Sequence, residues 1–525
     1  MRVQLPGGAG FRLAGWRAGA LSALAALTVV VLLLTLLGRL PGQGGTATAS
    51  TTTTGSASQS PSASLSIGPD VAGPVLAPVG AAAPEPTRAG LAAALGALIR
   101  DKNLGQHVGG AVIDLGTGQL LYGHDANGPF APASTSKLLT ATAALETLGP
   151  DFRITTKVVA GAVRDQIVLV GGGDPTLSTS APVGFVPAPA SLSDLARATA
   201  AALRAAGTTT VSLAYDSTLF SGPRTAPTWP ATYVSTGVVA PITALTVDEG
   251  RVGPIVEGIA PRVPDPPVAA ARAFARRLVA LGIKVTGPPT AVKAPPAPTT
   301  SPSPSSGSSA GTSTSTSTGT GTGTGTPSPV PLVAGTTLGL VRSPALSDLV
   351  GWMLAASDND LAEAVAHLTA LAAGEEPSFD GGVAAVTKTL TALRVPVQGI
   401  RIYDASGLTG STQVPPAVLA QVLALAGSPA RPRLRSLLTG LAVAGFTGSL
   451  GTRFEDPTTR RAAGVVRAKT GTLSVVSAIA GTVDDADGRV LAFVFLADEV
   501  TPGRTLDARL ALDRLVTAVA GCGCR

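Results

Sequence analysis

Hydrophobic residues along this chain first gather in one long uncharged block near the N-terminus. Arg2, Arg12 and Arg17 precede the block, which covers residues 18–38 and includes the run from Val29 to Leu34. A helix of that length spans about 30 Å, the thickness of one hydrocarbon core. Because basic residues favour the cytoplasmic side, the pattern predicts a short cytoplasmic tail over 1–17, a transmembrane anchor over 18–38 and the remainder outside the membrane.

The same block leaves a second interpretation open, a cleaved signal peptide, because Ala47-Thr48-Ala49 resembles a cleavage site. The apolar part of an ordinary signal peptide has only about 7–15 residues, which favours the uncleaved anchor. No cysteine closely follows the block, so a bacterial lipoprotein is excluded. Both interpretations place the folded part of the chain outside the membrane.

Downstream, apolar residues recur with periods of two and of three to four, which predicts short strands and amphipathic helices. Gly116-Thr117-Gly118 and Asp487-Gly488 mark hairpin turns between apolar strands. The predicted elements are a hairpin over 109–122, helices over 132–148, 346–372 and 505–520, and strands over 472–483 and 489–498. We expect the early and late elements to pack together as one α/β domain, formed by residues 88–150 and 338–525, with residues 151–337 inserted into it.

Two low-complexity segments separate these parts. Residues 39–87 are rich in Thr, Ser, Gly, Ala and Pro, and residues 295–331 contain Ser-Pro, Thr-Ser and Gly-Thr repeats. Neither composition can bury enough apolar surface to fold, so we expect a disordered linker and a disordered internal segment. The entropy of loop closure grows slowly with length, so a folded domain tolerates the internal segment.

Composition excludes several classes of function. The chain has 525 residues, with 38 Lys and Arg against 32 Asp and Glu, and a formal net charge of +6. The basic residues form no run and are not interleaved with aromatic residues, so we expect no nucleic-acid binding. Three His and two Cys, the latter at Cys522 and Cys524, give no metal-ligand spacing. We therefore expect no metal, no other cofactor and no catalytic role for the cysteine pair.

Three short motifs carry the candidate chemistry, and the first is Ser134-Thr135-Ser136-Lys137, near the start of the helix predicted over 132–148. Residues i and i+3 share one face of a helix, so Lys137 can act as the base that activates Ser134. A lysine does so only where burial or a neighbouring cation lowers its pKa. Alone, this motif is weak, because Ser and Lys often fall at this spacing by chance.

The second motif is Ser357-Asp358-Asn359, beside a helix over 361–372, and the third is Lys469-Thr470-Gly471-Thr472, which opens a predicted strand. Lys469 offers a cation for a carboxylate, and Gly471 removes a side chain where a substrate must lie against the strand. The competing interpretation is a capped helix, a polar turn and a strand-edge lysine that coincide. The order S-x-x-K, S-D-N, K-T-G in an exported chain argues against coincidence.

With these motifs the sequence resembles the D-alanyl-D-alanine carboxypeptidase/endopeptidase family, the class C low-molecular-mass penicillin-binding proteins, in an actinobacterial form. The long interval between the first and second motifs is similar to that family, which inserts extra domains there, whereas β-lactamases do not. The resemblance covers about residues 88–525, apart from the low-complexity segment. Its further matches are Leu169 to Leu177, Phe220 to Arg224, Trp229-Pro230, Val247 to Gly250, Asp404 to Leu408 and Leu441 to Gly445.

The resemblance implies a penicillin-binding/β-lactamase-like serine transpeptidase domain, an antiparallel sheet flanked by helices, split by one or more smaller β-rich domains. It implies a serine D-Ala-D-Ala carboxypeptidase that hydrolyses the end of peptidoglycan stem peptides through an acyl-enzyme in cell-wall remodelling. Its expected partners are stem peptides, β-lactam antibiotics and, through residues 18–38, the cytoplasmic membrane. If the N-terminal segment is cleaved, the enzyme is instead secreted to the cell wall.

The resemblance also implies a role for each catalytic residue. Ser134 is the nucleophile, and Lys137, kept neutral in part by the charge of Lys469, takes its proton. Ser357 relays a proton to the departing amine, and Asn359 orients Lys137 and the substrate amide.

A second group of residues is implied to bind the substrate. Lys469 and the hydroxyls of Thr470 and Thr472 hold its terminal carboxylate, and Gly471 leaves room beside the strand. The backbone N–H groups of Ser134 and Thr472 form the oxyanion hole.

Two positions depart from the family pattern. Members that bind the free end of a diaminopimelate side chain carry an Arg after the D-G-S-G-L-S stretch and an Asp shortly after Trp-Pro. This sequence has Thr409-Gly410 and Tyr233 there. The charged pair is missing, so preference for an uncrosslinked side chain and endopeptidase activity stay open, whereas carboxypeptidase chemistry does not depend on it.

Two other functions remain as alternatives: a serine β-lactamase, which needs an efficient deacylating base, and a membrane-tethered wall-binding protein with an idle catalytic centre.

We expect the remaining polar and aromatic residues to have structural roles. They are His107, His124 and His367 on surfaces or helix faces, Asp174, Asp216 and Asp248 in turns, Asp358 pointing away from the site, and Trp229 in packing or, with Tyr233, along the substrate approach.

Overall fold

The computed structural model describes residues 83–179, 187–252, 260–298 and 332–524. The predicted tail, the predicted anchor and most of the linker, as well as residues 299–331, lie outside the described residues. Within the described ranges, no helix is long and apolar enough to span a membrane.

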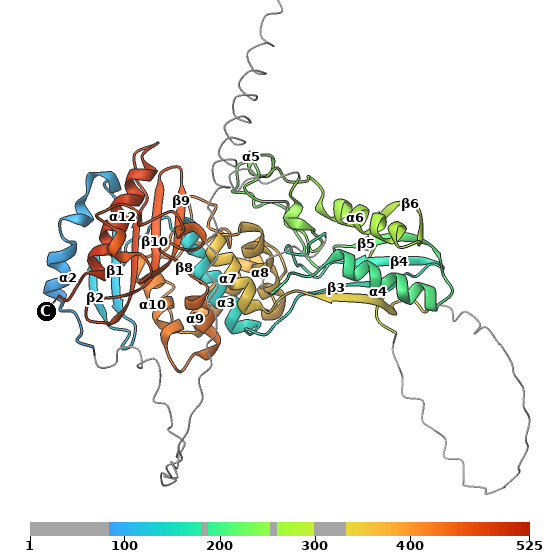
Figure 1. Ribbon diagram of the computed structural model, residues 1–525, viewed down its shortest axis with the longest axis horizontal. Helices are drawn as coiled ribbons and strands as arrows, with labels where there is room; N and C mark the ends of the chain where they lie inside the picture. The colour runs from blue at the N-terminus through green and yellow to red at the C-terminus, as the bar shows by residue number, and fades with distance from the viewer. Residues whose placement is uncertain (1–82, 180–186, 253–259, 299–331, 525) are drawn as a thin grey trace, which may run out of the picture. The chain divides into compact units, whose positions relative to one another are not determined.

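The first of two sheets has six strands in the order β2-β1-β11-β10-β9-β8 (Figure 1). These strands are β1 (Val108–Asp114), β2 (Leu120–His124), β8 (Ala442–Val443), β9 (Val466–Leu473), β10 (Val476–Asp484) and β11 (Val490–Ala497). All of its pairs are antiparallel, and β1 joins the late strands by pairing Val108 with Ala497 and Asp114 with Leu491. The antiparallel sheet expected from the resemblance is therefore confirmed.

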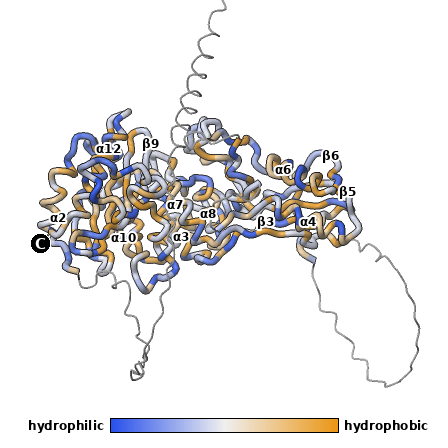
Figure 2. Tube along the Cα trace, in the orientation of Figure 1, coloured by the Kyte–Doolittle hydropathy of each residue, from blue (hydrophilic) through white to orange (hydrophobic). Residues whose placement is uncertain are grey.

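Successive residues of the central strands face two different cores, as the two-residue period of a strand requires. In β10, Ile479 and Val483 pack with the apolar residues of α2 (Arg88–Leu95) and α12 (Thr505–Ala520). Ala478 and Ala480 face the opposite core. β10 and β11 are buried on both faces and therefore consist largely of apolar residues. Figure 2 shows how hydrophobic residues are distributed along the chain.

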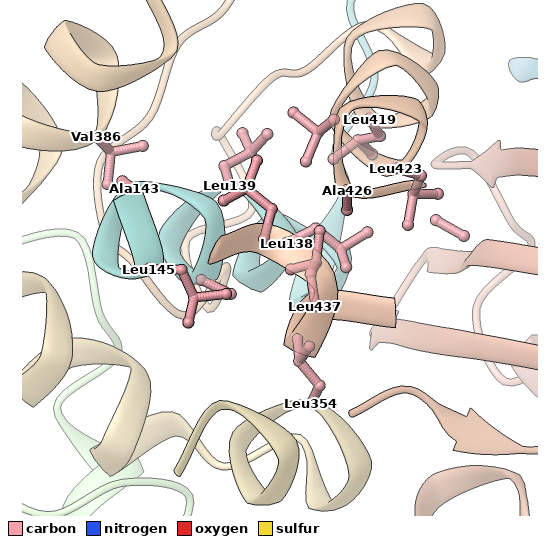
Figure 3. Packing of buried hydrophobic residues seen from close by; sticks show 14 of the residues in the cluster. Leu138, Leu139, Ala143, Leu145, Leu354, Val386, Leu419, Leu423, Ala426 and Leu437 are labelled. Atoms are coloured by element: carbon pink, nitrogen blue, oxygen red, sulfur yellow. The ribbon is translucent and has the colours of Figure 1, made fainter. Parts of the chain in front are cut away.

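Helices form the second core around α3, which directly follows the turn that carries the candidate nucleophile. They are α3 (Lys137–Thr147), α7 (Leu346–Ala356), α8 (Asn359–Ala373), α9 (Phe379–Ala392), α10 (Pro416–Gly427) and α11 (Arg435–Thr439). Leu138, Leu139 and Leu145 of α3 have no exposed surface. Figure 3 shows them among Leu354, Leu419 and Leu437 from three neighbouring helices. This packing holds α3 on all sides.

Two predicted boundaries are wrong. The single helix predicted over 346–372 is two helices, because Ser357 ends α7 in the left-handed region with φ 61°. The strand predicted over 472–483 is the end of β9, a turn and β10, so Lys469-Thr470-Gly471-Thr472 lies within a strand instead of opening one.

The second sheet has the order β6-β5-β4-β3-β7 and lies in the inserted region. Its strands are β3 (Thr155–Ala160), β4 (Gln166–Val170), β5 (Thr210–Asp216), β6 (Lys284–Ala291) and β7 (Thr337–Arg342). The helices α4 (Leu192–Ala205) and α6 (Pro266–Ala280) share its apolar core, and a short helix, α5 (Thr232–Ser235), follows β5. The inserted region was expected to be β-rich, and it also contains two long helices. Its last strand, β7, extends to Arg342, beyond the expected boundary at residue 337.

The two ends of the folded chain lie together. Thr87 caps α2 by accepting a hydrogen bond from the Gly90 amide, and its own amide donates to the Cys524 carbonyl at 2.7 Å. Cys522 and Cys524 form a disulfide, and Cys522 is buried against the core beneath α12. The hydrogen bond from Thr87 to Cys524 holds the C-terminal residues beside α2.

Candidate active site

Ser134 lies in a tight turn immediately before α3. The 3₁₀ turn Ala133–Ser136 leads directly into the helix, and Ala133 adopts φ 45°, a left-handed value that is uncommon outside glycine. Gly407 of the Asp404 to Leu408 stretch packs so closely that a Cβ there would lie 2.0 Å from the Ala133 carbonyl oxygen. Turn and neighbour together fix the direction of the Ser134 side chain.

Lys137 is fully buried, and its side-chain nitrogen has three hydrogen-bond acceptors. Nζ lies 3.0 Å from Ser134 Oγ, 2.7 Å from Asn359 Oδ1 and 2.7 Å from the Ser406 carbonyl oxygen. An ammonium has three N–H donors, so this set of acceptors satisfies each of them. The contact with Ser134 gives the serine a base within hydrogen-bond distance.

Burial favours the neutral amine of Lys137, the form that can serve as that base. Desolvation lowers its pKa to about 8, although nearby carboxylates, Glu363 foremost, oppose the shift. The charge of Lys469 was expected to contribute in part, and burial is the largest cause of the shift. The two lysines do repel each other, because the pKa of Lys469 is lowered first by burial and then by the charge of Lys137.

The second motif reaches the site through Asn359, the first residue of α8. Its Oδ1 faces Lys137, and its Nδ2 donates to the Val238 carbonyl in the inserted region at 3.0 Å. These two partners settle the orientation of the amide. Asp358 points elsewhere, as expected, because it caps α8 by accepting from the Leu361 amide. The Ser357 hydroxyl is half-buried and has no hydrogen-bond partner among the described residues.

The third motif lies on the part of β9 that has a neighbouring strand on one side only. Thr472 pairs with Ser477 of β10, whereas β8 pairs only with Arg467 and Ala468. Beyond Ala468, the outer edge of β9 is therefore free of a strand partner within the described chain. Such an edge can accept an extended peptide by backbone hydrogen bonding.

Gly471 brings this edge against the nucleophile turn. A Cβ at Gly471 would lie 2.6 Å from the Pro132 carbonyl oxygen and 3.1 Å from the Ser134 backbone nitrogen. The absent side chain is thus needed for β9 to reach Ser134. The backbone nitrogens of Ser134 and of Thr472, one residue further along, come from these two touching segments.

Each side chain of the third motif has a distinct environment. Lys469 is fully buried and donates to the Thr470 carbonyl oxygen at 2.6 Å. Thr470 Oγ1 bonds to Ser449 Oγ at 2.9 Å, and Thr472 Oγ1 accepts from Arg509 Nη2 at 3.2 Å. Within the described residues, Lys137 is thus hydrogen-bonded to both Ser134 and Asn359, and Gly471 lies beside Ser134. No hydrogen bond links Ser357 or Lys469 to those residues.

A family model of the D-Ala-D-Ala carboxypeptidase 3 (S13) family matches residues 91–261 and 320–519. The matched residues contain all three motifs and make up most of the chain. The chain belongs to this S13 family.

Relatives of this S13 carboxypeptidase agree with the assignment. Carboxypeptidase Rv3627c of Mycobacterium tuberculosis is 35% identical over 453 residues, 85% of this chain and 87% of the relative. Carboxypeptidase DacB of Mycolicibacterium smegmatis is 34% identical, covering 87% of this chain and 89% of its own. The expected actinobacterial form of the family is confirmed. Family membership makes the chain a serine-type, penicillin-binding D-Ala-D-Ala carboxypeptidase.

A solved structure shares the fold of the S13 carboxypeptidase. Penicillin-binding protein 4 of Haemophilus influenzae aligns with a TM-score of 0.60 and 19% identity, over 81% of this chain and 98% of that one. At this identity the likeness bears on the fold alone. The penicillin-binding/β-lactamase-like α/β fold is confirmed.

Sequence reasoning missed the residues that hold Lys137 in place. Glu363, one turn after Asn359 on α8, is buried and accepts from the backbone amides of Ala405 and Ser406 at 2.8–3.1 Å. It therefore positions the Ser406 carbonyl that bonds to Lys137. Burial raises the pKa of Glu363 to about 8. The sequence feature that could have pointed to Glu363 is an acidic residue within an otherwise apolar helix pattern.

Asp404 organises the same turn of the S13 carboxypeptidase. It has no exposed surface and accepts from the Gly407 and Thr409 amides, each at 2.7 Å. The Trp229 indole N–H of the inserted region also donates to it, at 2.8 Å. Trp229 therefore packs, as expected, and also links the inserted region to the site.

An acidic cluster beside the second motif provides another such link. Glu249, Asp358 and Asp360 lie together, with Arg262 3.0 Å from Asp360 and 3.5 Å from Glu249. Asp360 also accepts from the Ala240 amide at 2.7 Å. Burial raises the pKa of Asp360 to about 6, although Arg262 opposes the shift.

Four of the other residues expected in structural roles make structural contacts. Asp174 and Asp216 accept from residues two positions ahead, and Asp248 accepts from the Thr179 amide. His367 lies on α8 but is buried between the rings of Phe220 and Phe379, and burial lowers its pKa to about 4.

Proposed function

We propose that Ser134 attacks the carbonyl carbon of the penultimate D-Ala of a peptidoglycan stem peptide. The observation that carries this proposal is the buried Lys137 amine 3.0 Å from the Ser134 hydroxyl. The neutral amine takes the hydroxyl proton as the C–O bond forms. The backbone N–H groups of Ser134 and Thr472 stabilise the oxyanion, and one such donor is typically worth about 2.7–4 kcal/mol.

Collapse of the tetrahedral intermediate breaks the peptide bond and releases D-Ala. Ser357 passes the proton from Lys137 to the departing nitrogen, and its unengaged, half-buried hydroxyl suits this relay. Asn359 keeps Lys137 aligned throughout. Water then attacks the Ser134 ester, Lys137 takes a proton from the water and passes it to the departing Ser134 oxygen, and the shortened stem peptide leaves. A β-lactam follows the first half of this sequence and stops at the acyl-enzyme.

Lys469, Thr470 and Thr472 bind the terminal carboxylate of the stem peptide in this proposal. Burial and Lys137 lower the pKa of Lys469, so an arriving anion would stabilise its charged form. Lys469→Ala should therefore weaken hydrolysis of a free-acid peptide much more than that of the C-terminal amide. Equal losses on both peptides would contradict this role.

The nucleophile is tested by intact mass after addition of penicillin. Wild type should gain one adduct that persists and maps to Ser134, and Ser134→Ala should gain none. Ser136→Ala is the matched control, because Ser136 lies in the same turn and its hydroxyl has no partner within the described residues. Full labelling of Ser134→Ala would refute the assignment.

The same measurement separates the two alternative functions. Consumption of penicillin without an adduct would identify a β-lactamase. An unlabelled protein with the antibiotic intact would identify an idle wall-binding protein. Release of D-Ala from D-Ala-D-Ala peptides by wild type then establishes the carboxypeptidase reaction.

The stem side chain is, we propose, held without a charged pair. Thr409 is buried, and its hydroxyl bonds to Asp404 at 2.5 Å and to Thr228 at 2.7 Å. Tyr233 stands at the other position, where the family pattern has an Asp. Peptides with a free and with an acylated diamino acid side chain should therefore have similar kcat/KM, which would also permit endopeptidase activity on crosslinked stems. Strong preference for the free side chain would contradict this.

For location, we propose a single-pass membrane protein with its catalytic domain outside. The support is the uncharged block over 18–38 behind three arginines. Detection of the full-length chain in the membrane fraction would agree with an anchor. A shortened chain in the medium or the cell wall would indicate cleavage.

A further inference from the structure

Arg509 reaches the third motif from a helix far away in the sequence. It lies on α12, which packs against the sheet, and its Nη2 donates to Thr472 Oγ1 at 3.2 Å. The guanidinium is half-buried. Because a guanidinium only donates, the Thr472 oxygen accepts, and the hydroxyl proton remains free for an acceptor of its own.

The charge of Arg509 has no carboxylate partner in the described chain. The nearby Asp513 is almost fully buried and pairs with Arg453 through both of its oxygens. Arg453 also donates to the Arg509 backbone carbonyl at 3.2 Å. One carboxylate thus lies near two guanidinium groups and pairs with Arg453, which leaves an excess positive charge beside Thr472.

We propose that Arg509 is a specificity-determining residue that binds the C-terminal carboxylate of the stem peptide together with Thr472. This inference rests on the proposed function, in which that carboxylate lies at the third motif. Arg509 would supply the second cation, at the exposed end of the carboxylate site, while the buried Lys469 supplies the first. Its contact with Thr472 holds the free hydroxyl proton toward the same anion.

The position of Arg509 makes an anionic ligand favourable. Burial and the charge of Arg453 lower the pKa of Arg509, so its cation is destabilised in the free enzyme. A carboxylate against this group removes that destabilisation and gains charge-assisted hydrogen bonds. A planar guanidinium fits a carboxylate with two parallel N–H donors, which an ammonium cannot reproduce.

The test compares Arg509→Gln with wild type as full chains on two peptides that differ only at the C-terminus, a free acid and a carboxamide. Arg509→Gln should lower kcat/KM for the free acid by about 10- to 100-fold, mainly through KM. It should leave the carboxamide within about threefold. Arg509→Lys should restore part of the preference for the free acid. Arg514→Gln removes a charge from the same helix away from Thr472 and should match wild type.

Equal losses of Arg509→Gln on both peptides, or no loss on either, would overturn the proposal. Acylation by penicillin and by its methyl ester supplies a second readout that needs no peptide hydrolysis. If wild type labels but does not hydrolyse peptides, the proposed function fails, while selective slowing of Arg509→Gln on the free-acid antibiotic still supports the carboxylate site. A similar thermal midpoint for all variants assigns the changes to binding.

Discussion

The Lys137 amine lies 3.0 Å from the Ser134 hydroxyl and has no exposed surface. The pairing gives the serine a base whose protonation state depends on pH near neutrality, because burial lowers the pKa of Lys137 to about 8. Only the neutral amine accepts a proton. The acid limb of the rate is therefore a direct report on this residue.

We predict that acylation by penicillin rises about tenfold per pH unit up to a pH near 8 and then levels off. Below pH 8 Lys137 is mostly protonated, and the reactive fraction falls as the pH falls. Stopped-flow acylation rates between pH 5.5 and 9 check this. A rate that is flat from pH 6 to 9 would exclude Lys137 as the titrating base.

Glu363→Gln should move that acid limb to lower pH. The ionised Glu363 carboxylate is the largest opposing influence on the lowered pKa of Lys137. Its own pKa of about 8 places that ionisation in the pH range where Lys137 titrates, so its removal lets the pKa of Lys137 fall further. Glutamine can still accept from the Ala405 and Ser406 amides through its oxygen. The plateau rate should therefore fall less in Glu363→Gln than in Glu363→Ala, which loses the acceptor as well.

The control for this change is Glu376→Gln, since the Glu376 carboxylate accepts a hydrogen bond from the Ser221 hydroxyl in an exposed loop. Its pH profile should coincide with that of wild type. An unmoved acid limb in Glu363→Gln would mean that Glu363 supports the fold without tuning Lys137.

Gly471→Ala should slow acylation by about 100-fold, because about 1 Å of misplacement at a reacting centre can cost that much. The new methyl would meet the Pro132 carbonyl at 2.6 Å, forcing β9 away from Ser134. Gly351→Ala is the matched control, because its methyl would meet nothing closer than 3.8 Å. Penicillin labelling of both variants checks the prediction, and a Gly471→Ala rate close to wild type would mean that β9 need not touch the turn.

The sequence was sufficient for the residues of the three motifs because each is a short run with its own chemistry. The roles of Glu363 and of the Ser406 carbonyl could not be predicted from the sequence. They depend on a backbone turn that contacts α8 only in the folded chain. Arg509 is similar, because a single Arg on an amphipathic helix carries no sign of contact with Thr472.

Element boundaries failed where the hydrophobic pattern continues across a break. Residues 346–372 contain no Pro, and apolar residues recur on both sides of Ser357, whose left-handed conformation separates α7 from α8. The turn at Ser474 and Val475 between β9 and β10 likewise contains no Gly or Pro. The antiparallel sheet was predictable because its strands alternate with recognisable turns such as Asp487-Gly488.

Trp229→Phe should lower the free energy of unfolding by about 1–3 kcal/mol. The substitution keeps an aromatic ring against Phe379, which lies edge-on at 5.2 Å, but removes the indole N–H that donates to Asp404. Asp404 has no access to water that could replace this donor, because its side chain is fully buried.

Tyr403→Phe serves as the control, since it removes a polar group from an adjacent, exposed aromatic residue. Chemical denaturation of the two variants and wild type gives the comparison. If Trp229→Phe is as stable as Tyr403→Phe, the bond between the inserted region and the Asp404 turn contributes nothing, and the inserted region must be held to the catalytic domain by other contacts, such as Asn359 with Val238 and Asp360 with Ala240.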